Sequence, residues 1–302
     1  MLKVLITAAI LLFVFPGISF AQEKGIRISP ALLDVVIDGD DSEKDIEITI
    51  ENLTGNTIQL SLTALDFKQA NETGGIDFLG IDAQDYSYAL ASFISFESSI
   101  VTIENGERQS VEATVTNRPD LSPGGHYAAI VGHLVNENND VDRSAAVRPA
   151  ISSLVLLRKT GGEVFSQSLL ETNWPKTVMF GFPNTQLQLL FQNEGNVHLI
   201  PYGTVTIKDI FGQQITRGTI NNASSIIFPE SRRWVDVRLN PFSYKLPLSF
   251  VTMDIKGRDS IDKTTFVYQQ TALLINPLIL IVLTGLIGGS LYYKKKKNAK
   301  KA

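Results

Sequence analysis

The 302-residue sequence contains no cysteine and only three histidines. The absence of cysteine excludes a disulfide scaffold, a thiolate zinc site, an iron–sulfur cluster and a cysteine nucleophile. Two of the histidines, His126 and His133, are seven residues apart on one predicted strand, which places them on opposite faces. No Walker-type loop, dinucleotide fingerprint, zinc-protease motif or serine-hydrolase elbow occurs. We therefore predict that the protein is not an enzyme and has no cofactor and no metal site.

Charge is almost absent from the first 21 residues, which have the pattern of an export signal. Lys3 precedes an apolar run over residues 4–15, and a Pro-Gly break follows it. Ser19 and Ala21 then supply small side chains at the −3 and −1 positions of a cleavage site. This order is typical of a secretory signal peptide, which we predict over residues 1–21. An uncleaved anchor helix is the alternative.

A second charge-free run covers residues 272–293, a length of 22 residues. About 20 apolar residues are needed for a helix to cross the hydrocarbon core of a membrane. Tyr292 and Tyr293 close the run as an aromatic belt would, and the lysine-rich residues 294–302 would remain in the cytoplasm. The pattern predicts a single-pass plasma-membrane protein whose bulk is extracellular or periplasmic.

Basic residues are scarce between these two segments. Seven of the 27 basic residues and none of the acidic ones lie in residues 1–21 and 272–302, so the remainder carries 20 basic and 31 acidic side chains, a net of −11. Such a surface argues against binding nucleic acid and suits a cationic partner. Residues 38–43 resemble a calcium loop in composition but lack the glutamate and central glycine of an EF-hand. A solvated turn and a weak calcium site are both open interpretations.

Long helical periodicity is missing from the central part, which alternates like β-strands. Residues 45–52 place Ile46, Ile48 and Ile50 on one face and polar side chains on the other. Similar segments recur every 8–15 residues, as in β-sandwiches. We predict an all-β fold with two immunoglobulin-like β-sandwich domains in tandem. They would span residues 22–159 and 163–270, because the Thr-Gly-Gly of residues 160–162 makes a short flexible boundary.

Two turns in these domains have matching sequences. Asn52 and Gly55 follow an alternating strand, as Asn193 and Gly195 do 141 residues later, and each turn contains Gly-Asn. Asn and Gly accept the positive φ angles that tight turns require. The match suggests a repeated domain, and two unrelated hairpin-like turns are the alternative.

A third turn precedes a long apolar strand. Pro123, Gly124 and Gly125 can form a tight turn, and Tyr127 then enters the strand. This order resembles the tyrosine corner of immunoglobulin-like domains, in which the tyrosine hydroxyl ties the turn to the strand. We predict a structural role, with a ligand site at His126 and Tyr127 as the alternative.

An insertion at residues 71–96 is rich in aromatic residues. Tyr86, Tyr88, Phe93 and Phe96 supply side chains typical of binding patches, on a long loop of the kind that often carries recognition. These four residues are the candidate partner-binding site. In the alternative, they pack back on the sheet as a lid.

The order of several short motifs resembles that of a known family. The motifs are Ile28-Ser-Pro30, Asn52-x-Thr-Gly55, Gly74-Gly-Ile76, Ala91-Ser-Phe-Ile-Ser-Phe96 and Ser122-Pro-Gly-Gly-His-Tyr127. The chain is similar in these to the WxL-interacting proteins, bacterial surface proteins whose first extracellular domain is described as peptidoglycan-binding. More distantly, it is similar to the first domain of periplasmic pilus chaperones, although their paired basic cleft residues have no counterpart here.

The resemblance implies a membrane-anchored bacterial surface module that binds cell-wall polymer or exported partner proteins without covalent chemistry. A chaperone-like assembly factor for exported surface subunits is the alternative, and it would capture them by strand addition at an exposed sheet edge. A surface hydrolase is a third hypothesis, which would require a cleft with converging titratable groups.

Overall fold

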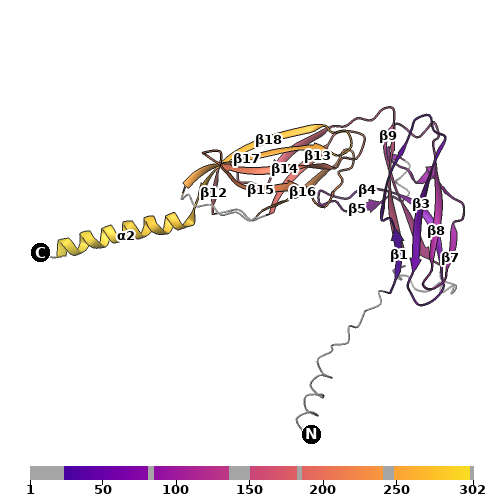
Figure 1. Ribbon diagram of the computed structural model, residues 1–302, viewed down its shortest axis with the longest axis horizontal. Coiled ribbons are helices and arrows are strands. Elements are labelled where there is room, and N and C mark those ends of the chain that lie inside the picture. Colours follow the sequence, from indigo (N-terminus) through magenta and orange to yellow (C-terminus); the bar gives the residue numbers. More distant parts are fainter. Residues whose placement is uncertain (1–23, 81–84, 136–149, 182–185, 241–247, 300–302) are drawn as a thin grey trace, which may run out of the picture.

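The structure is a computed structural model that describes residues 24–80, 85–135, 150–181, 186–240 and 248–299. Its strands divide into two groups that pair only among themselves, an N-terminal unit of strands β1–β10 and a C-terminal unit of strands β11–β18. The two units meet at a bend, and helix α2 (Pro277–Ala299) projects from the far end of the C-terminal unit (Figure 1). The predicted all-β fold is confirmed. The predicted signal peptide at residues 1–21 lies outside the described residues.

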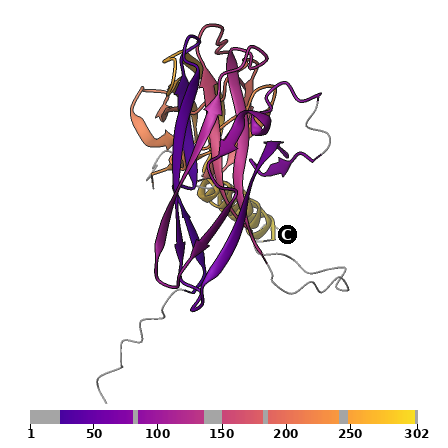
Figure 2. The same cartoon turned by 90° about the vertical axis from the view of Figure 1, so that its right-hand side faces the viewer.

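The N-terminal unit is a sandwich of two sheets, whose long strands run side by side in Figure 2. The four-stranded sheet has the order β1-β3-β8-β6, and the six-stranded sheet has the order β2-β10-β9-β4-β5 with β7 paired to β4. The strands are β1 (Ile26–Ser29), β2 (Leu32–Ile37), β3 (Glu43–Asn52), β4 (Ile58–Gln69), β5 (Ile76–Phe78), β6 (Ile94–Phe96), β7 (Ile100–Ile103), β8 (Arg108–Thr116), β9 (Gly124–Leu134) and β10 (Ala150–Lys159).

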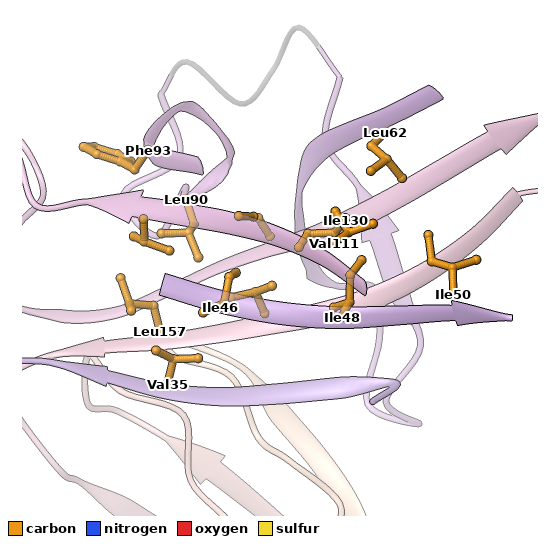
Figure 3. Packing of buried hydrophobic residues seen from close by; sticks show 14 of the residues in the cluster. Val35, Ile46, Ile48, Ile50, Leu62, Leu90, Phe93, Val111, Ile130 and Leu157 are labelled. Atoms are coloured by element: carbon orange, nitrogen blue, oxygen red, sulfur yellow. The ribbon is translucent and has the colours of Figure 1, made fainter. Parts of the chain in front are cut away.

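The core of this unit follows from the alternation of its strands. Ile46, Ile48 and Ile50 of β3 are all buried and point between the sheets, while the residues between them are more exposed. Side chains of the opposite sheet, among them Leu62 and Ile130, meet them there (Figure 3). Burial of a branched aliphatic side chain stabilises a fold by about 1.5–3 kcal/mol, so this layer supplies the main stabilising contact between the sheets.

The chain changes sheets near its beginning. β1 pairs antiparallel with β3 in one sheet, and after Pro30 the next strand, β2, pairs parallel with β10 in the other. Proline has no backbone N–H to contribute to a sheet ladder, which suits a position between two strands. The switch leaves the first half of β10 without β2 beside it.

Strand β9 is buried on both faces. Ala128 and Ile130 face the core between the two sheets. Tyr127, Ala129 and Val131 face the other way, into a second apolar cluster that includes residues of the C-terminal unit. A strand that is apolar on both sides needs cover on both sides, and here the C-terminal unit provides part of it.

The C-terminal unit forms one continuous eight-stranded sheet in the order β11-β13-β16-β15-β14-β17-β18-β12, wrapped around its own apolar core. All neighbours are antiparallel except β12 and β18. The strands are β11 (Gln167–Thr172), β12 (Val178–Phe180), β13 (Gln186–Asn193), β14 (Pro201–Asp209), β15 (Gln214–Ile220), β16 (Arg232–Leu239), β17 (Leu248–Asp259) and β18 (Thr265–Ile275).

The predicted membrane span at residues 272–293 is wrong. Residues 272–275 are the end of β18, paired with β17 and β12, and Ala272 and Leu274 are buried in the core of the C-terminal unit. In the described part of the chain, no helix has the length and apolar character needed to cross a membrane. The prediction of a single-pass plasma-membrane protein with a cytoplasmic tail is corrected accordingly. An uncharged apolar run does not by itself distinguish a buried strand from a helix, and this run contains a strand end before its helix begins.

Candidate binding site

Three aromatic rings join the two units. Tyr127 of β9, Phe67 of β4 and Phe228, which precedes β16 in the C-terminal unit, are all buried. The ring centroid of Phe228 lies 4.8 Å from that of Tyr127 and 5.5 Å from that of Phe67, in edge-to-face geometry in both pairs. Such pairs contribute about 0.5–1.5 kcal/mol beyond their buried area. We call this contact and the residues around it the junction.

Two of the four aromatic residues proposed for partner binding lie at the junction. The Tyr88 ring packs 6.3 Å from Tyr127, and its hydroxyl donates a hydrogen bond of 3.1 Å to the Glu230 carboxylate of the C-terminal unit. Burial, together with this carboxylate, raises the pKa of Tyr88 to about 12. The Tyr86 ring packs edge-on against Tyr88, and burial raises its pKa as well. These two tyrosines thus form a bridge between the units.

The other two candidates belong to the N-terminal core. Phe93 is buried in it, in a 3-10 turn (Ala91–Phe93), and the Arg118 guanidinium lies 4.3 Å above its ring. Phe96 is half-buried and packs against the same core. The structure therefore does not bring the four aromatics together as one exposed patch, and partner binding by this set stays a prediction.

The turns singled out in the sequence meet at the junction. The Gly125 N–H donates to the Asn196 carbonyl at 2.8 Å, and the Asn196 side chain donates to the Gly162 carbonyl at 3.0 Å. A Cβ at Gly195 would lie 2.0 Å from the Val164 carbonyl oxygen, so only glycine fits there. The turn of residues 193–196 thereby fastens both the 123–125 turn and the connection between the units.

Tyr127 differs from the tyrosine corner that the sequence resembles. Its hydroxyl is buried, and no hydrogen-bond partner for it occurs among the described residues. A Cβ at Gly125 would lie 2.1 Å from this oxygen, so the glycine makes room for the hydroxyl instead of bonding to it. Because the ring contacts Phe228 of the other unit, it is the ring that gives Tyr127 its structural role here.

A hairpin of the insertion forms a further contact between the units. At the β4–β5 turn, the Glu72 carbonyl accepts a hydrogen bond of 2.8 Å from the Trp234 N–H. The Gln69 side chain accepts one of 3.0 Å from the Ser231 hydroxyl. The Arg233 guanidinium fills the space where a Cβ of Gly74 would stand, and burial lowers its pKa. Arg233 thus packs inside this contact.

The Asp38–Glu43 loop is held by hydrogen bonds within the protein. The Asp41 carboxylate accepts the Asp38 N–H at 3.2 Å, and the Thr160 hydroxyl donates to the Asp38 carboxylate at 3.2 Å. Over the residues that the structure describes, no three His, Cys, Asp or Glu side chains are grouped so that they could hold a metal ion. A weak calcium site in this loop gains no support from the geometry.

The first half of β10 offers an open strand edge. β9 pairs with the whole strand, from Ala150 to Lys159, whereas β2 pairs only from Leu154 onward. Within the described ranges no strand pairs with residues 150–153 on the β2 side. Backbone groups of a strand alternate in direction, and Leu154 donates its N–H toward β2, to the Ala31 carbonyl. The N–H and C=O of Ser152 therefore point to the same side.

The surroundings of this edge are apolar on one face. Ile151 is half-buried and packs against the core between the sheets, as Ile26 and Ile28 of β1 also do. The Ser153 hydroxyl donates a hydrogen bond of 2.7 Å to the Pro30 carbonyl, which fixes the point where β1 departs. The edge thus combines main-chain groups that no described strand pairs with an apolar side-chain surface.

Sequence analysis did not identify several of these residues. Phe67 and Phe228 were not selected, nor was the open edge, because each depends on segments far apart in the chain. The signal that was available is the two-sided apolar character of β9, which indicates cover on both faces.

Comparisons with known proteins find no matching family model and no matching curated protein. Solved structures similar to the chain include the class 5 fimbriae chaperone CfaA, with 12% identity over 82% of this chain and 99% of that one and a TM-score of 0.44. A Salmonella enterica complex of the SafA pilin with the SafB chaperone has 10% identity over 82% and 96%, with a TM-score of 0.37. The Pseudomonas aeruginosa CupB2 chaperone has 9% identity over 79% and 97%, with a TM-score of 0.36. At such values these similarities do not identify a function, which has to come from the chain's own geometry.

Proposed function

We propose that the protein is a non-enzymatic binding protein that captures an extended segment of an exported partner by strand addition. The captured segment would pair with residues 150–153 of β10, beyond the start of β2. The observation that carries the proposal is the incomplete pairing of β10, which has a neighbour along its full length on one side and along residues 154–159 only on the other.

The edge has the two components that strand addition needs. Main-chain hydrogen bonds supply affinity, and pockets for alternate side chains supply specificity. Here the N–H and C=O of Ser152 face the open side, and Ile151 continues the apolar core up to the edge. The captured strand would lie in line with β2 and direct every second side chain toward Ile151 and Ile28. We therefore expect a segment with alternating apolar residues.

The junction lies at the other end of the two paired strands that carry the edge. β9 and β10 form the edge at one end and reach the C-terminal unit at the other, through Tyr127 and the 123–125 turn. A fixed framework loses less conformational freedom on binding, which favours affinity. The net negative charge between the terminal segments favours a partner segment with basic flanks.

The test uses a ten-residue peptide of alternating Val and Thr with a Lys at each end, labelled for fluorescence anisotropy. In the variant Ser152→Pro, the open-side N–H is lost without loss of a bond to β9, so binding should fall by at least about tenfold, equivalent to about 1.4 kcal/mol. Val36→Pro is the matched control, because the Val36 N–H points away from β10 at the outer edge of the same sheet. Binding in Val36→Pro should equal that of the wild type.

The two variants also separate the possible edges. Loss of binding in Val36→Pro with retention in Ser152→Pro would place capture at β2 and overturn the proposal. Equal binding in both variants, or no binding by the wild-type chain, would overturn strand addition at this sheet altogether. The thermal unfolding midpoint of each variant verifies that it is folded.

A further inference from the structure

His198 is a buried titratable group at the junction that strand capture does not use. It lies two residues after the turn of residues 193–196, and its side chain is 1% exposed. Its Nε2 atom stands 3.7 Å from Oδ1 of Asp34 on β2, whose side chain is 48% exposed. The pair therefore spans the two units, with a buried imidazole on one side and a solvent-accessible carboxylate on the other.

The imidazole has no other means of satisfying its nitrogens. Neither ring nitrogen of His198 has a hydrogen-bond partner within the described ranges, and the 3.7 Å separation from Asp34 is too long for one. The Tyr127 ring packs edge-on against it, with 5.9 Å between the centroids. On protonation the imidazole would face the Asp34 carboxylate across the junction, and this attraction would offset the cost of burying the charge.

The other ionisable groups around the pair favour an ionised Asp34. Arg158 on β10 acts on Asp34 through its charge and is itself paired with Glu163 at 3.1 Å. The nearby His198 side chain and the Arg158 charge, opposed by burial, lower the pKa of Asp34. The Tyr127 ring of β9 packs against His198, and burial raises the pKa of its hydroxyl far above neutral pH. Asp34 therefore remains charged in weak acid.

We propose that the junction is a proton-operated clamp, in which protonation of His198 creates an ion pair with Asp34 and tightens the contact between the two units. The clamp requires a charged histidine and a charged aspartate at the same time. This inference is independent of whether the β10 edge captures a strand.

The test measures the distance between the units in the full chain. Because the sequence has no cysteine, Gln109→Cys and Gln213→Cys introduce two specific spin labels at exposed positions, one on each unit. We expect the distance distribution to narrow when the pH is lowered from about 8 to about 5. Asp34→Asn should abolish this narrowing, since it removes the charge while keeping the shape of a half-exposed side chain.

Asp120→Asn is the matched control, because Asp120 is an exposed carboxylate that pairs with Arg118 within the N-terminal unit. The distance distribution of this variant should narrow at low pH as that of the wild type does. A wild-type distribution that is the same at both pH values, or an Asp34→Asn distribution that still narrows, would overturn the clamp. His198→Asn provides a second variant, whose distance distribution should remain broad at both pH values. Circular dichroism verifies that this variant is folded.

Discussion

Asn52 and Asn193, 141 residues apart, make the same set of hydrogen bonds. Each is fully buried at the end of a strand. Each Nδ2 donates a hydrogen bond of 2.7 Å to the carbonyl of the residue four positions ahead. Each also donates to a distant backbone carbonyl, Ile103 at 2.9 Å for the first and Ile227 at 3.0 Å for the second. Each Oδ1 accepts a backbone N–H two residues ahead. The two units thus close one turn by the same device.

This equivalence predicts that alanine at either position destabilises the protein by a similar amount. Asn52→Ala leaves the buried Ile103 carbonyl without this donor, and Asn193→Ala leaves the buried Val197 and Ile227 carbonyls without theirs, at a cost of about 1–3 kcal/mol per unsatisfied group. Urea unfolding measures the loss. The exposed Asn222 is the control, and Asn222→Ala should change the free energy of unfolding by less than about 0.5 kcal/mol. If the buried variants behave like this control, the side chains do not hold the turns.

The glycines of the same two turns should differ in their tolerance of alanine. Gly195→Ala would place a Cβ against the Val164 carbonyl, whereas Gly55 has nothing within 4 Å of its added Cβ. Gly55→Ala then costs only the strain of its positive φ of 98°, about 1 kcal/mol. Gly195→Ala should cost more, about 1–3 kcal/mol from overpacking, and should expose residues 160–166 to protease. Equal unfolding midpoints for the two variants would contradict the close contact at Gly195.

Removal of the Tyr127 hydroxyl distinguishes the two roles considered for this residue. In a tyrosine corner the hydroxyl holds the turn, and Tyr127→Phe would destabilise by about 1 kcal/mol or more. In this structure the hydroxyl is buried without a partner, so Tyr127→Phe should be neutral or stabilising in chemical denaturation. Phe228→Ala, which removes the ring from the other unit, should instead cost about 3–5 kcal/mol. A clear loss of stability in Tyr127→Phe would show that the hydroxyl holds the turn, as in a tyrosine corner.

The sequence predicts local features of this fold well, because they depend on neighbouring residues. Alternation places Ile46 on the core side, and the Asn-Gly spacing indicates a turn at Asn193. What these residues contact in the folded protein depends on segments far away in the sequence. Gly195 touches the connection between the units, and Phe93 is drawn into the core, although its local sequence resembles that of an exposed binding loop.

The wrong membrane span has a similar origin. Ala272 and Leu274 belong to an apolar run with the composition of a membrane helix. They form part of a sheet instead, because β18 pairs with β17 and β12 at these residues. Pairing partners far away in the sequence are not visible to a hydropathy pattern. The open edge of β10 is missed for the same reason, since it results from the departure of β1 near Pro30.

His126 should make the protein less stable as the pH falls. Its ring is buried, with Nδ1 3.1 Å from the Ala89 carbonyl and Nε2 2.8 Å from the Ser122 carbonyl, and burial lowers its pKa below the ordinary 6.5. The unfolded chain then binds a proton at a higher pH than the folded protein does. Stability contributed by the neutral ring is present above about pH 6.5 and decreases below it, by at most about 1.4 kcal/mol per pH unit.

Unfolding in urea at a series of pH values measures this slope. In His126→Gln, which keeps a hydrogen-bonding side chain but does not titrate, the slope below about pH 6.5 should be reduced. His133→Gln on the same strand is the control for the loss of a histidine side chain as such. A His126→Gln slope as steep as that of the wild type would show that other groups cause the acid sensitivity. Because the turn that holds His126 also contacts Asn196 of the other unit, a reduced slope would connect acid stability to the junction.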